Sequence, residues 1–170
     1  KAMEQGVATY PADIEARIVY ALALGQPALP TDKSYANQLK AASILEEEFT
    51  RQPQHPGLAH YIIHSFDVPP LASRGLNAAR RYSAIAPDAA HALHMPSHTF
   101  TRLGLWQDSI EANLASAAAA HRDNAAAEEL HALDYQTYAY LQTAQDGTAR
   151  KTLDLVPVLT PKVATGGAGN

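Results

Sequence analysis

Two pairs of histidines carry the chemistry that this sequence offers most clearly. His60 and His64 form one H-x-x-x-H pair, and His94 and His98 form a second pair 34 residues further along the chain. Residues four apart on a helix lie on one face about one turn apart, so each pair presents two imidazoles together. Imidazole nitrogens bind zinc, copper, nickel and iron. The spacing therefore predicts a shared binding site without specifying a reaction.

The elements that must position these histidines are predicted to be helices. Proline and glycine residues divide the chain, and the segments between them have helical patterning. We expect helices over about 13–24, 31–51, 57–66, 72–85, 89–103, 106–122, 125–144 and 148–156. Thr31 or Asp32 is expected to cap the second helix, the segment 25–30 to break the chain, and Pro157 and Pro161 to close the last helix.

These helices group into antiparallel pairs, which predicts an all-α fold. The pairs are expected at about 10–53, 56–87, 88–122 and 125–158, within a domain that spans 7–158. Residues 159–170 are expected to form a flexible tail. A period of 34 residues is typical of tetratricopeptide repeats, so we expect the pairs to stack into a right-handed superhelix, an α-solenoid.

The composition excludes several classes of protein. The net charge of −4 and the absence of a basic stripe argue against a nucleic-acid partner. No apolar run approaches the roughly 18 residues that a membrane span needs. The chain has no cysteine, so disulfides, thiolate catalysis and cysteine-based zinc sites are excluded.

Three segments resemble a family of bacterial tetratricopeptide-repeat proteins. They are residues 55–65 (HPGLAHYIIHS), 86–98 (APDAAHALHMPSH) and 131–135 (HALDY), and the resemblance extends over residues 10–156. Members of that family are longer and usually begin with a secretion signal. The resemblance implies a repeat fold, a fragment of a longer protein and a periplasmic or exported location in a bacterium, but it carries no settled activity.

In such repeats the second, fifth and ninth places of each unit line a concave groove. His60 and His64 then occupy places five and nine of one repeat, and His94 and His98 occupy the same places of the next. The other polar residues at these groove-facing places are His91, His131, Asp134, Tyr138 and Glu15. We expect the two histidine pairs to be metal ligands, and these five residues to contact a ligand or complete the shell.

Other residues have ordinary structural interpretations. His55 and His121 are expected to be solvated or hydrogen-bonded, and Tyr135 is expected to pack between helices. Pro96 lies inside the predicted helix 89–103, where it either kinks the helix or marks its true start. A kink would re-aim the histidines on either side of it.

The sequence leaves three functions open. The first is a repeat scaffold whose groove binds Zn, Cu or Ni, or a small anionic ligand, through the histidines. The second is a scaffold for protein–protein interaction that binds a peptide without metal. The third is a metal-dependent hydrolase-type enzyme, which needs an open coordination position and a placed general base. The zinc-protease motif H-E-x-x-H is absent, because Tyr61 follows His60. The sequence therefore does not by itself predict an enzyme.

Overall fold

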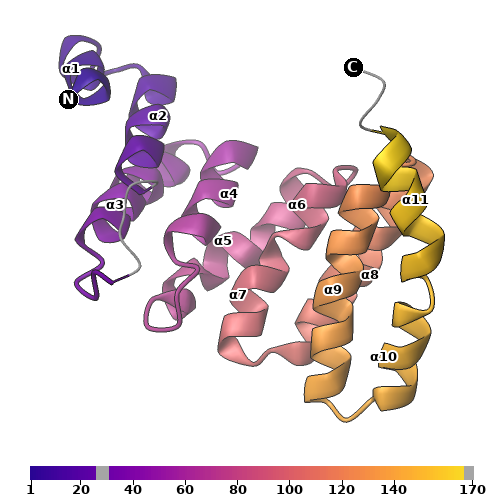
Figure 1. Cartoon of the computed structure of the whole chain (residues 1–170). Coiled ribbons are helices and arrows are strands. Elements are labelled where there is room, and N and C mark those ends of the chain that lie inside the picture. The colour runs from indigo at the N-terminus through magenta and orange to yellow at the C-terminus, as the bar shows by residue number, and fades with distance from the viewer. Residues whose placement is uncertain (26–30, 167–170) are drawn as a thin grey trace.

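The structure, a computed structural model, describes residues 1–25 and 31–166, and it is helical throughout with no strand in those ranges (Figure 1). This confirms the predicted all-α class. The helices are α1 (Ala2–Thr9), α2 (Ile14–Gly25), α3 (Ala36–Arg51), α4 (Pro56–Ser65), α5 (Ala72–Ile85), α6 (Ala90–His94), α7 (Pro96–Leu103), α8 (Trp106–Arg122), α9 (Ala126–Gln142), α10 (Asp146–Leu153) and α11 (Val156–Gly166).

Helices that are consecutive in the chain pack against one another. The pairs are α2 with α3, α4 with α5, α6 and α7 with α8, and α9 with α10. Each pair also contacts the next, because α3 packs on α4, α5 on α7, and α8 on α9. Figure 1 shows the pairs following one another from the N-terminus to the C-terminus. The chain is therefore held together by contacts between neighbouring pairs.

The largest apolar core joins α2 through α7. Its bulkiest fully buried side chains include Leu45, Leu58, Ile63 and Phe66. Small residues fill the closest helix contacts, since Ala41, Ala42 and many other alanines are fully buried. This packing fixes α4 against the helices that follow it, and so fixes the place of the first histidine pair.

The helix predicted over residues 89–103 is interrupted at Pro96. The predicted helix 89–103 is two helices, α6 and α7, and Pro96 is the first residue of α7. Met95 between them keeps helical angles, and its carbonyl accepts a hydrogen bond from the His98 N–H at 3.2 Å. Because proline lacks the N–H that would continue the α6 ladder, the break follows directly from the sequence. His94 ends one helix and His98 lies in the first turn of the other.

Two boundaries differ from the sequence-based expectation near the N-terminus. Neither Thr31 nor Asp32 caps the second long helix, because α3 begins only at Ala36. Asp32 instead accepts hydrogen bonds from the N–H and hydroxyl of Ser34, a local turn that competes with helix formation. The chain also forms an additional helix, α1, before the first predicted one. The predicted break at 25–30 lies, after Gly25, outside the described residues.

The C-terminal prediction was wrong for most of the expected tail. Pro157 and Pro161 do not close the array, because α11 runs from Val156 to Gly166 and packs against α9. Pro157 occupies the first turn of α11, where a missing N–H costs nothing. Residues 159–166 are therefore helical, and residues 167–170 lie outside the described part of the chain.

Gly104 ends α7 in the left-handed conformation, with φ of 70°. A Cβ at this position would meet no close neighbour, so only the backbone conformation opposes a side chain. We expect Gly104→Ala to lower the free energy of unfolding by about 1 kcal/mol in urea denaturation. Gly147→Ala in α10 is the matched control, because that glycine has ordinary helical geometry, and it should be neutral or slightly stabilising. Equal effects of both changes would contradict this account.

Among the described residues, no helix is both long enough and apolar enough to cross a membrane.

Candidate metal centre

The structure gathers the predicted histidines into two groups of three. His60, His64 and His91 form one group, and His94, His98 and His131 form the other. We call these the first triad and the second triad. Within each triad the candidate ligand atoms all lie within 4.8 Å of one another, close enough to hold a metal ion. The first triad draws on α4 and α6, and the second on α6, α7 and α9.

The His94 imidazole is held in one tautomer by a buried amide. His94 is 1% exposed, and its Nδ1 lies 2.6 Å from Oδ1 of Asn113 on α8. The Asn113 amide is itself oriented, because its Nδ2 donates to the Ser109 carbonyl at 2.8 Å. Nδ1 of His94 must therefore carry the proton and donate to Asn113. Its Nε2 is then left as a lone pair.

The His98 imidazole is oriented in the same way by a carboxylate. Its Nδ1 lies 3.0 Å from Oδ2 of Asp67, in the turn after α4, and 3.3 Å from the Tyr135 hydroxyl. Asp67 also accepts a hydrogen bond from Arg102 Nε at 2.8 Å. Burial raises the pKa of Asp67, but the hydrogen bonds from His98 and Arg102 outweigh it and lower that pKa overall. The carboxylate therefore accepts a hydrogen bond from the Nδ1–H group of His98. Nε2 of His98 points away from the carboxylate and carries the lone pair.

The two oriented nitrogens face each other. Nε2 of His94 and Nε2 of His98 are 3.0 Å apart, and both are the nitrogens that the outer partners leave without a proton. Two lone pairs at that distance repel unless a proton or a metal ion lies between them. Two nitrogens bound to one tetrahedral zinc lie roughly 3.3 Å apart. Hydrogen bonds to the second ring nitrogen are also the usual support of metal-bound histidine.

Comparison with known proteins adds no assignment. No protein-family model, curated protein or solved structure matches this chain. The candidate site therefore has to be interpreted from its own geometry.

His131 and His91 complete the triads rather than lying beside a four-histidine site. The His131 ring centre is 4.3 Å from that of His94, and the His91 ring centre is 5.0 Å from that of His60. The expected convergence of the two pairs is present, since the His64 and His98 ring centres are 6.1 Å apart. Within each pair the Nε2 atoms are closer, at 2.8 Å between His60 and His64.

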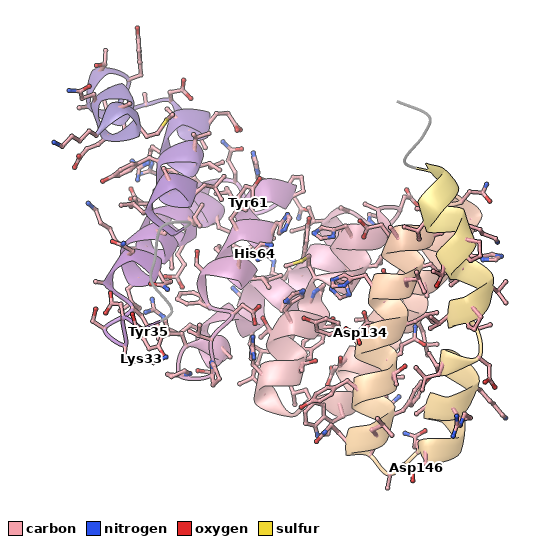
Figure 2. All side chains as sticks on the ribbon, in the orientation of Figure 1. Lys33, Tyr35, Tyr61, His64, Asp134 and Asp146 are labelled. Atoms are coloured by element: carbon pink, nitrogen blue, oxygen red, sulfur yellow. The ribbon has the colours of Figure 1, made fainter. Side chains whose placement is uncertain are left out.

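The other predicted ligand-binding residues are not part of either triad. Glu15 lies outside both triads, and its carboxylate is 3.1 Å from Nε2 of His55 at the start of α4. Asp134 and Tyr138, on α9, line a cavity of about 250 Å³ together with His98. Figure 2 labels His64 on α4 and Asp134 on α9, on either side of the middle helices. Tyr138 is 48% exposed and packs edge-on against Trp106.

Three residues of the site were missed or assigned otherwise from the sequence. Tyr135, expected to pack between helices, lies edge-on to His94 at 4.8 Å between ring centres and reaches His98 with its hydroxyl. Asp67 and Asn113 are not among the candidate site residues that the sequence indicates. Asn113 shares a buried face of α8 with Ser109, Ile110 and Ser116, and the helical spacing of these residues was the available signal for its burial, although not for its contact with His94.

Burial favours the neutral form of three of these histidines by lowering their pKa values. It lowers the pKa of His94 to about 3, against a hydrogen bond to Asn113 that raises it, with smaller lowering by His131 and His98. Burial also lowers the pKa of His60 to about 4, and His64 and His91 add to the lowering. Burial likewise lowers the pKa of His64, with His98 as the next cause. Neutral imidazoles are the form that binds metal.

The lowered pKa values predict that the metal-free protein loses stability in mild acid. Below a pH of about 6.5, His94 and His60 bind protons in the unfolded chain but remain unprotonated in the native protein. Acid therefore favours unfolding. The stability is complete above that pH and falls as the pH drops toward the native values of about 3 and 4. We expect up to about 1.4 kcal/mol per pH unit from His94.

Urea denaturation at pH 7, 6 and 5 in the presence of a chelator measures this effect. His94→Gln, which cannot titrate, should show a shallower pH dependence than the parent. His121→Ala, which removes a histidine 69% exposed and paired with Glu129, should keep the parent slope. A free energy of unfolding that is the same at pH 7 and pH 5 would refute the expectation.

Proposed function

We propose that this protein binds a transition metal ion, of the class Zn, Cu or Ni, through Nε2 of His94 and His98 and a ring nitrogen of His131. The observation that carries the proposal is the 3.0 Å distance between Nε2 of His94 and Nε2 of His98. Asn113 and Asp67 each bind the Nδ1–H group of one ring, which leaves both Nε2 atoms as acceptors. Neutral nitrogen ligands suit these metals, and they suit magnesium or calcium poorly. In the metal-free protein a proton can occupy the same gap.

The fold supports a structural role for such an ion. His94 and His98 belong to the middle helices α6 and α7, whereas His131 belongs to the next pair, in α9. We infer that the pairs stack as tetratricopeptide-like repeats, which contact mainly their neighbours. An ion held by both pairs would fasten their interface. Ligand binding to the native state alone stabilises it by about 2.7 kcal/mol when the free metal exceeds Kd a hundredfold.

The test uses the full chain without a histidine tag. Protein stripped with a chelator is titrated with Zn²⁺, Cu²⁺ and Ni²⁺ by calorimetry, and its melting temperature is recorded with and without each ion. We expect at least one equivalent to bind and the melting temperature to rise. No binding and no change in melting with any of the three ions would refute the proposal. Calcium and magnesium serve as controls and should have no effect.

A further inference from the structure

The first triad repeats the second one helix pair earlier in the chain. In each, two histidines four residues apart come from one helix pair, and the third comes from the helix pair that follows. His60 and His64 on α4 are completed by His91 on α6, as His94 and His98 are completed by His131 on α9. Surface histidines without a shared role would not be expected to take the same arrangement at equivalent places in two successive helix pairs.

Stacked aromatic rings hold the first triad in place. The His60 ring lies against Tyr61 at 5.0 Å and 16°, and against Tyr82 at 5.7 Å and 24°, so two tyrosines fix its plane. His64 approaches it with an Nε2–Nε2 distance of 2.8 Å, and the His91 ring centre is 5.0 Å away. The three rings therefore converge before any ligand binds.

Each triad also has one carboxylate beside it, and each carboxylate comes from a helix pair that contributes at least one histidine to the other triad. Asp67, in the turn that follows α4, contacts His98 of the second triad at 3.0 Å. Glu128, on α9, lies 3.5 Å from Nδ1 of His91 in the first triad. One carboxylate is thus placed against each group of three imidazoles, which favours a cation in both.

The two triads are close enough to interact. The ring centres of His64 and His98 are 6.1 Å apart, and those of His91 and His94 are 6.2 Å apart. A bound ion lies roughly 3 Å from the centre of each ligand ring, so ions in the two triads would be within roughly 12 Å of each other. His91 and His94 are also three residues apart on one short helix, α6, so both sites depend on its position.

The series of sites ends after two. On α9, Asp134 and Tyr138 follow His131 at the spacings at which His94 and His98 follow His91. A third H-x-x-x-H pair is therefore missing at the next equivalent position. Among the described residues, the structure likewise gathers two histidine triads.

We propose that His60, His64 and His91 bind a second transition metal ion and that the two ions form an interacting pair. This inference rests on the proposed metal-binding function and adds a second site to it. Each triad supplies three ligands, and a tetrahedral ion takes four, so each ion keeps one position for water or a small anion. His64 and His91 of the first triad are partly exposed to solvent, whereas His94 of the second triad is buried, so we expect the first triad to be the weaker site.

Copper titration followed by electron paramagnetic resonance tests the pair on the full, untagged chain. The parent should bind two Cu²⁺ per chain. The second equivalent should produce magnetic coupling, seen as dipolar broadening or splitting of the Cu²⁺ spectrum relative to two separate ions. His64→Ala, a change at an exposed side chain, should bind one Cu²⁺ with an uncoupled spectrum. His121→Ala is the matched control and should bind two with the coupled spectrum.

The outcomes separate this inference from the proposed function. One Cu²⁺ in the parent, with no change in stoichiometry in His64→Ala, overturns the second site and leaves the first ion in place. Two Cu²⁺ without coupling overturn the pair, and two Cu²⁺ retained by His64→Ala with its spectrum unchanged place the second ion elsewhere. No bound copper, zinc or nickel overturns both proposals together.

Discussion

His98→Ala should weaken metal binding to the second triad by more than about 100-fold. His98 supplies one of the three ligand nitrogens, and its loss also removes the link to Asp67. Changes to residues that merely support a ligand typically cost 10–100-fold, so loss of a ligand should exceed that range. Isothermal titration of the stripped protein with Zn²⁺ gives the affinity, and the rise in melting temperature at saturating zinc should shrink with it.

His121→Ala is the control for this change. His121 is on α8, exposed and paired with Glu129, and it belongs to neither triad. Its removal should leave zinc affinity within about twofold of the parent. If His98→Ala binds zinc as tightly as His121→Ala at the high-affinity site, the second triad is not that site.

Asn113→Leu should lower zinc affinity by 10–100-fold without touching a ligand. Leucine has a similar size but cannot accept a hydrogen bond from the Nδ1–H group of His94. The His94 ring is then no longer held with Nε2 toward the metal. The buried N–H of His94 also loses its partner, which should cost about 1–3 kcal/mol of stability. Zinc titration and urea denaturation, each with the metal-free protein as reference, measure the two effects separately.

Asn77→Leu is the matched control, because Asn77 is an exposed asparagine on α5 outside both triads. It should alter neither zinc affinity nor stability by more than a small amount. An Asn113→Leu variant that loses stability but keeps the parent zinc affinity would show that Asn113 supports only the fold.

Helix type and the grouping of histidines could be predicted from the sequence because both depend on short spacings. The four-residue spacing of His60 and His64 places them on one helix face whatever the rest of the chain does. The 34-residue interval then predicts that a second pair occupies an equivalent place, and the two pairs do lie within reach of one another.

What could not be predicted depends on contacts between distant segments. Asp67 reaches His98, and Asn113 reaches His94, only because α4, α7 and α8 pack together. No local pattern marks either residue as a partner of a histidine. Tyr135 was misjudged for a related reason, since a tyrosine between helices can pack and hydrogen-bond at once. The error at Pro157 was different, because proline also favours helix starts.

The distribution of the ligands along the chain has a consequence during synthesis. The first triad is complete only when His91 has emerged, and the second only when His131 has emerged from a later helix pair. A nascent chain would therefore acquire its sites in order from the N-terminus, the weaker one first. Metal supplied before His91 or His131 has emerged would find only two histidines of the corresponding triad. A chain that ends before α9 would lack both His131 and Glu128. Full metal loading would thus report that translation has passed residue 131 and that three successive helix pairs have folded.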